Sequence, residues 1–184
     1  MYQIQQRDLD IIAFVKEFKV INSEIVAKLF FSNSNNCITL ANRRLKKLVE
    51  LGKLNRSKRT NILEPYIYYI GSKPSNWKHS LLIAQSFCDI CSKYSVIKYK
   101  REYEIVFKNN KLRCDLMTIV KDNDNNIKAF IIEIQNAKYY KDKWTEYINK
   151  GYWRNKFGVL PRIIVYSRFN SYKSSISIEF IKLE

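Results

Sequence analysis

The chain has 184 residues and a mass of 22.0 kDa, with 46% hydrophobic residues, which suits one ordinary domain or two small ones and excludes a disordered protein. Lys and Arg number 33 against 17 Asp and Glu, a formal net charge of +16, so a polyanion such as nucleic acid is the first partner to consider. No apolar run approaches the roughly 20 residues of a membrane helix, and the first ten residues hold no apolar signal segment. We therefore expect a cytoplasmic protein with no membrane partner.

Helical spacing of apolar residues recurs three times near the start of the chain. Residues 7–20 place Leu9 and Ile12 on the apolar face of a first helix. A second helix is expected over residues 21–31, and a third over residues 37–52, which Gly52 ends.

The third expected helix has two different faces. Apolar residues such as Ile38 and Leu45 share one of them. The opposite face carries side chains able to contact DNA, namely Thr39, Asn42, Arg43, Lys46 and Lys47. Asn and Arg are residue types that make bidentate contacts with base edges in the major groove.

Two short strands follow, over residues 54–57 and 66–70, and a basic connection with Arg56, Lys58 and Arg59 joins them. Three helices followed by a hairpin predict a winged helix–turn–helix over residues 1–70, with the hairpin reaching phosphates. The alternative is that the charged helix face is only solvated and that the domain mediates protein contacts.

A linker is expected at GSKPSN, residues 71–76, before a second domain over residues 77–184. The pattern in this domain predicts a helix, three strands, a helix and two strands, which is an α+β arrangement. The expected helices are residues 77–94 and 136–150, and the expected strands are residues 96–107, 111–120, 126–134, 159–167 and 176–183.

Carboxylates mark the middle of this second domain. Asp115 and Glu133 fall on neighbouring antiparallel strands, where facing side chains approach within about 5 Å. Two carboxylates that close favour a divalent cation between them, and oxygen ligands suit Mg²⁺ or Mn²⁺. Glu102 or Glu104 is a further candidate ligand, and Gln135 shares the face of Glu133. The alternative is that Asp115 only pairs with a neighbouring basic residue.

Other motifs in the second domain have less specific explanations. Lys138 and Lys141 stand among aromatic residues after Glu133, a mixture that suits a nucleic-acid backbone. Cys88 and Cys91 form a CxxC within a helical pattern, so reduced buried thiols are expected and zinc or redox use is the alternative. The DNDNN segment, residues 122–126, imitates a calcium loop but lacks its glycine, so we expect a turn.

The helix–βββ–helix–β order with Asp115 and the Glu133-Ile134-Gln135 element resembles the PD-(D/E)XK nuclease superfamily. Together with the winged helix and HSLLIA, which begins at His79, it is similar to the replication-relaxation family of plasmids, phages and mobile elements. The resemblance implies an N-terminal winged helix–turn–helix followed by a restriction-endonuclease-like αβββαβ domain. It also implies that Asp115 and Glu133 are metal-binding catalytic acids, with Gln135 where Lys is usual.

Two function classes follow from these patterns. The first is a protein that binds double-stranded DNA in replication or mobilisation of a mobile element, with or without Mg²⁺- or Mn²⁺-dependent nicking. The second is a non-catalytic regulator or relaxosome accessory factor whose nuclease-like domain only binds DNA or forms a homodimer. An RNA-binding factor is a third and disfavoured option.

Overall fold

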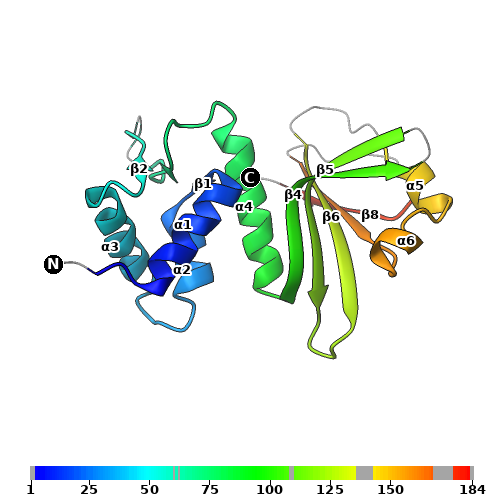
Figure 1. Cartoon of the computed structure of the whole chain (residues 1–184), viewed down its shortest axis with the longest axis horizontal. Helices are drawn as coiled ribbons and strands as arrows, with labels where there is room; N and C mark the ends of the chain where they lie inside the picture. Colours follow the sequence, from blue (N-terminus) through cyan, green and yellow to red (C-terminus); the bar gives the residue numbers. More distant parts are fainter. Residues whose placement is uncertain are drawn as a thin grey trace. The chain divides into compact units, whose positions relative to one another are not determined.

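The computed structural model describes residues 3–59, 61, 63–107, 110–135, 143–167 and 176–182. The chain forms two compact units, residues 1–92 and residues 93–184 (Figure 1). The α+β class expected from the sequence is confirmed, with helices beside a three-stranded and a five-stranded sheet. Among the described residues, no helix combines the length and the apolar composition needed to cross a bilayer.

Unit 1, residues 1–92, is built from four helices and a small sheet. Its strands pair antiparallel in the order β1-β3-β2. The elements in chain order are α1 (Gln6–Phe18), β1 (Val20–Ile21), α2 (Ser23–Phe30), α3 (Cys37–Glu50), β2 (Asn55–Arg56), β3 (Tyr68–Tyr69) and α4 (Trp77–Cys91). The two-residue strand β1 is absent from the sequence-based expectation because it is too short to show a period.

The core of unit 1 explains why α4 belongs to it. The ring of Phe87 on α4 lies 5.0 Å from that of Phe18 and 5.8 Å from that of Phe14, both on α1. The sequence pattern places residues 77–94 in the second domain, whereas the buried face of α4 packs in unit 1.

Two helices each expose one residue that was expected on the apolar face. On α1 the fully buried positions include Ile11 and Phe18, while Leu9 is 49% exposed. On α3, Ile38 is 42% exposed, and Leu45 is buried. The expected core positions Leu9 and Ile38 are therefore wrong.

Unit 2, residues 93–184, is a five-stranded sheet with two short helices. The strand order is β4-β5-β6-β7-β8; β4, β5 and β6 are antiparallel, and β6, β7 and β8 are parallel. The strands are β4 (Ser95–Phe107), β5 (Asn110–Lys121), β6 (Ile127–Gln135), β7 (Arg162–Ser167) and β8 (Ile178–Lys182), and the helices are α5 (Thr145–Asn149) and α6 (Arg154–Phe157). Residues 136–142, the start of the expected helix 136–150, lie outside the described residues.

One core of unit 2 lies between the sheet and the helices α5 and α6. Trp144 and Tyr147 are completely buried there, against Ile131 of β6 and Val165 of β7. Glu133 projects from the same face of β6 as Ile131, because side chains alternate along a strand. The strand β6 thus carries a carboxylate into an apolar layer.

Candidate functional site

The structure places Asp115 and Glu133 across from each other at the end of a strand ladder. The β5–β6 pairing runs in register from Lys121 to Leu116, which faces Ile132. The next position along each strand is Asp115 on β5 and Glu133 on β6. The charge of Asp115 contributes to raising the pKa of Glu133, after the larger effect of burial.

Glu133 is buried, with its side chain 11% exposed, and two donors hold one of its oxygens. The ammonium group of Lys143 lies 2.9 Å from Oε1, and the indole N–H of Trp144 donates to the same oxygen at 3.1 Å. Burial raises the pKa of this carboxyl to about 7, while Lys143 opposes that rise. The carboxyl group of Glu133 therefore gains or loses its proton near neutral pH.

Asp115 closes the ladder with its side chain. Its Oδ2 accepts a hydrogen bond from the backbone N–H of Ile134 at 2.7 Å. This N–H lies just beyond the last β5–β6 pair, so the carboxylate takes the place of a strand carbonyl. Asp115 thereby fixes the backbone on the far side of Glu133.

Lys143 also contacts this site, although the sequence pattern did not predict it. Besides contacting Glu133, its ammonium donates to the carbonyl of Arg113 at 2.5 Å, so it ties the segment before α5 to β5. Lys143 brings to Glu133 the positive charge that Gln135 lacks. Gln135 itself is half-buried at the end of β6, opposite Ser167 of β7. The Lys-Trp pair directly before α5 was the available signal, but periodicity does not tell which strand such a pair contacts.

Glu102 and Glu104 do not join this acidic pair. Their side chains are 54% and 50% exposed, and they form ion pairs with Arg113 at 2.8 Å and Lys111 at 3.2 Å. Within the described part of the chain, no three His, Cys, Asp or Glu side chains gather closely enough to hold a metal ion. Neither Glu102 nor Glu104 therefore supplies the third carboxylate expected beside Asp115 and Glu133, because both pair with basic neighbours on β5.

The two carboxylates of Asp115 and Glu133 match the number of protein ligands that a Mg²⁺ ion commonly uses. Mg²⁺ is commonly bound through one or two carboxylates, with water and substrate phosphates supplying the other ligands. A cation at Glu133 would share its carboxylate with the ammonium of Lys143. The two residues that would hold the ion are therefore Asp115 and Glu133, with Lys143 as a competitor or as a neighbouring charge.

Most of the α3 residues that were expected to contact DNA are exposed to solvent. Thr39, Asn42, Arg43 and Lys46 are exposed, and Lys47 is half-buried. Two of these side chains have partners within unit 1. Asn42 accepts a hydrogen bond from the hydroxyl of Ser23 at 2.5 Å, and Lys47 lies 3.1 Å from Glu50. Arg43 and Lys46 are consequently the residues on this face best placed for an external anion.

The connection between β2 and β3 gathers basic side chains on one aromatic ring. The guanidinium groups of Arg56 and Arg59 lie 4.4 Å and 3.7 Å from the ring centre of Tyr66. Lys58 is exposed between them in the chain. The ring holds two cations in place by cation–π attraction and leaves their outer edges toward solvent. Lys138 and Lys141, also expected to bind DNA, lie outside the described residues.

The cysteines of unit 1 behave as structural thiols. All four cysteines of the chain are free. Burial raises the pKa of Cys88 to about 11 and that of Cys91 to about 12, so neither is a thiolate at neutral pH.

The calcium-like segment, residues 122–126, is a turn between β5 and β6. Asp122 accepts hydrogen bonds from the backbone of Asp124 and of Asn126, and it pairs with Lys128 at 2.7 Å. These hydrogen bonds and the ion pair hold the pKa of Asp122 at about 2. The carboxylate oxygens of Asp122 thus stabilise the turn, as expected for a hairpin connection.

Comparison with known proteins gives limited similarity. No family model and no curated protein matches the sequence. Among solved structures, EndoMS in its apo form shares 12% identity and a TM-score of 0.31, covering 71% of this chain and 64% of that one. Protein VC1899 from Vibrio cholerae shares 16% identity and a TM-score of 0.32, covering 90% of this chain and 48% of that one.

A third structure is Can2 from Sulfobacillus thermosulfidooxidans in complex with cyclic tetra-adenylate. It shares 14% identity and a TM-score of 0.34, covering 87% of this chain and 51% of that one. The chain thus spans between 48% and 64% of the length of these three structures. TM-scores this far below 0.5 do not establish a common fold.

Proposed function

We propose that this chain is a double-stranded DNA-binding protein of a plasmid, phage or other mobile element, acting in replication or mobilisation. Unit 1 is its DNA-reading module, a winged helix–turn–helix over residues 1–70. In this arrangement α3 enters the major groove, and the β2–β3 connection contacts phosphates. The order α1, α2, α3, β2, β3 and the basic composition of both surfaces support this assignment.

The proposal rests on the exposure of two cationic side chains of α3 and on their lack of an acidic partner among the described residues. Arg43 and Lys46 are exposed on consecutive turns, and no carboxylate among the described residues forms an ion pair with either. An acid three or four residues away can neutralise a cation on a helix face, as Glu50 does for Lys47, and Arg43 and Lys46 have no such ion pair among the described residues. Unpaired cations in a chain of net charge +16 suit phosphate and base contacts.

The experiment separates base reading from phosphate contact. A preferred duplex is first selected from a random pool, and binding to it is compared with binding to unrelated duplex and to RNA. Arg43→Ala is expected to reduce discrimination between the duplexes, and the double variant Lys58→Ala/Arg59→Ala is expected to weaken binding to both and to lower the salt slope. Equal loss of discrimination in both variants, or tighter binding to RNA, would contradict the proposal.

A second candidate function is metal-dependent nicking by unit 2. Its support is the adjacency of Asp115 and Glu133 at the end of the β5–β6 ladder. A divalent ion bound there would lower the pKa of a water and neutralise charge on a phosphate. Lys143 would supply a fixed positive charge beside that phosphate, in place of the neutral Gln135.

The ion pair between Lys143 and Glu133 also supports the non-catalytic alternative, because the ammonium of Lys143 already neutralises the charge of Glu133 without a metal. Nicking of supercoiled plasmid with Mg²⁺ or Mn²⁺, together with calorimetric metal titration, distinguishes the two. An active site predicts nicking that Asp115→Asn and Glu133→Gln abolish and that Lys143→Met lowers about 100-fold or more. Absence of nicking and of a metal signal would leave the binding function alone. Metal binding that appears only in Lys143→Met would identify the lysine as a built-in replacement for the ion.

A further inference from the structure

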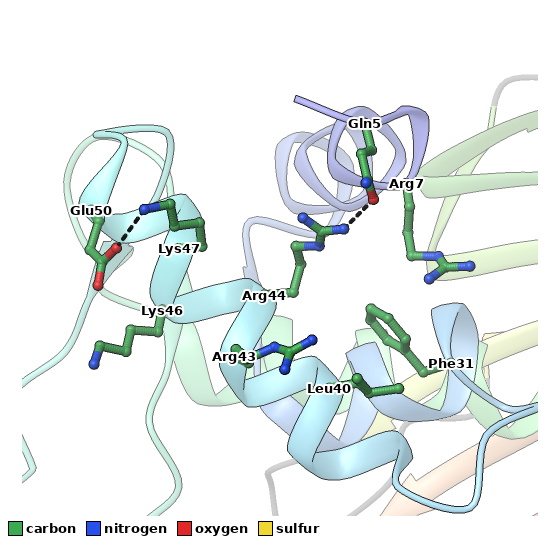
Figure 2. A pocket seen from close by; sticks show the side chains of 9 residues that line it. All are labelled: Gln5, Arg7, Phe31, Leu40, Arg43, Arg44, Lys46, Lys47 and Glu50. Atoms are coloured by element: carbon green, nitrogen blue, oxygen red, sulfur yellow. Dashed lines mark hydrogen bonds and ion pairs between the residues drawn. The ribbon is translucent and has the colours of Figure 1, made fainter. Parts of the chain in front are cut away.

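A basic groove in unit 1 begins at the exposed face of α3 and continues beyond it. A cavity of about 620 Å³ lies between the start of α1, the residue after α2 and one side of α3, and its walls include Arg7, Phe31 and Arg43 (Figure 2). A second hollow of about 400 Å³ shares Arg7 and Phe31 with the first and continues along Ser32, Asn33 and Ser34. The two hollows together form a groove with Arg7 at its centre.

Arg44 is the structural member of this groove. Its Nε lies 3.2 Å from Asp8, which is completely buried, and its guanidinium also donates to the side chain of Gln5. Asp8 in turn accepts the backbone N–H of Gln5 at 2.9 Å. These contacts use the charge of Arg44 to fix the start of α1 against α3.

Arg7 has a different setting. Its guanidinium lies 4.7 Å from the ring centre of Phe31, which is itself buried, so the ring supports the cation from one side. Figure 2 shows the side chains of Arg7 and Arg43 on either side of Phe31. The one acid in the groove wall, Glu50, is paired with Lys47. Among the described residues, no carboxylate forms an ion pair with Arg7 or Arg43.

We propose that this groove holds the sugar–phosphate backbone of DNA, so that the contact of unit 1 extends from α3 across Arg7 to residues 32–34. The inference rests on the proposed DNA-binding function and adds a phosphate site outside the helix–turn–helix residues already named. Guanidinium groups bind phosphate in a planar two-pronged geometry, and the amide of Asn33 and the hydroxyl of Ser34 are groups that can donate to phosphate oxygens. A concave wall that carries unpaired cations and small polar donors is complementary to one strand of backbone.

The test compares two variants of α1 that lose the same charge. Arg7→Ala removes the cation at the centre of the groove, and Lys16→Ala removes an exposed cation in the last turn of the same helix, outside the groove. The dissociation constant for a random duplex is measured by fluorescence anisotropy over a range of salt concentrations. Arg7→Ala is expected to weaken binding several-fold and to reduce the salt slope by about one, whereas Lys16→Ala is expected to keep the slope of the parent protein.

Two further variants complete the test. Arg7→Lys is expected to recover part of the affinity because it keeps the charge, and Asn33→Asp is expected to weaken binding by placing a negative charge at the far end of the groove. Thermal unfolding confirms that each variant is folded. The same slope for Arg7→Ala and Lys16→Ala would overturn the inference while leaving the proposed function intact. Absence of DNA binding by the parent protein would overturn both.

Discussion

At the scale of single residues, Glu133 shows how its surroundings set the chemistry of an acid. Its strand places it in an apolar layer, which favours the neutral carboxyl, and Lys143 and Trp144 favour the charged carboxylate. Burial is the larger influence, so the pKa rises from an ordinary value of 4.5 to about 7. A group of this kind changes charge near neutral pH, where an exposed glutamate stays ionised.

The raised pKa of Glu133 predicts a pH dependence of stability. The folded protein holds this proton more tightly than the unfolded chain, so the contribution of Glu133 is greatest below about pH 4.5 and is lost as the pH rises to about 7. The loss is on the order of 3 kcal/mol. Urea unfolding of the parent protein and of Glu133→Gln across this range measures it. As the pH rises, the parent protein should lose more unfolding free energy than Glu133→Gln does. The same pH dependence in both proteins would contradict a raised pKa for Glu133.

The hydrogen bond from Trp144 to Glu133 predicts a cost for losing the indole N–H. Trp144→Phe keeps an aromatic ring in the core but removes the donor, and a loss of about 2–4 kcal/mol in unfolding free energy is expected from the bond and the lost volume together. The same change made in Glu133→Gln should cost less, because the acceptor there is neutral. An equal cost in both backgrounds would show that only the volume of the ring matters.

At the scale of elements, α4 is the helix whose place could not be read from the sequence. Its apolar face is clear in the periodicity, but a helix face does not identify the surface that covers it. In the folded chain Phe87 packs on Phe14 and Phe18, so α4 closes the core of unit 1.

This packing predicts which unit a core substitution in α4 weakens. Phe87→Ala is expected to destabilise unit 1 by about 3–5 kcal/mol, since it removes a buried aromatic side chain from between helices. Amide hydrogen exchange locates the effect. Faster exchange is expected in α1 and α4, with little change in β5 and β6. Faster exchange in the strands alone would place α4 with the other unit.

Most helices and strands could be predicted from the sequence, because periodicity and turn residues are local signals. The pairing of Asp115 with Glu133 was also accessible, since a short turn joins their strands and fixes the register. The contact of Lys143 with Glu133 was not, because it depends on how the chain folds back after β6. The partners of Glu102 and Glu104 depend in the same way on which neighbour each side chain meets across β4 and β5.

At the scale of the whole molecule, positive charge is spread along the chain instead of being confined to one segment. Residues 1–92 hold 14 basic and 7 acidic residues, and residues 93–184 hold 19 and 10. Each unit therefore attracts a polyanion in its own right, and the surface of α3 supplies the residue types that read bases. DNA binding through α3 is the claim on which the proposed functions and the phosphate groove depend.

The most direct test is the salt dependence of duplex binding by the parent protein and by Arg43→Ala/Lys46→Ala. Between roughly 50 and 200 mM salt, the parent protein should lose affinity steeply as counterions return to the DNA. The double variant should bind at least tenfold more weakly at the lower salt concentration, with a slope reduced by about two. Unchanged affinity and slope in the double variant would contradict DNA binding through α3.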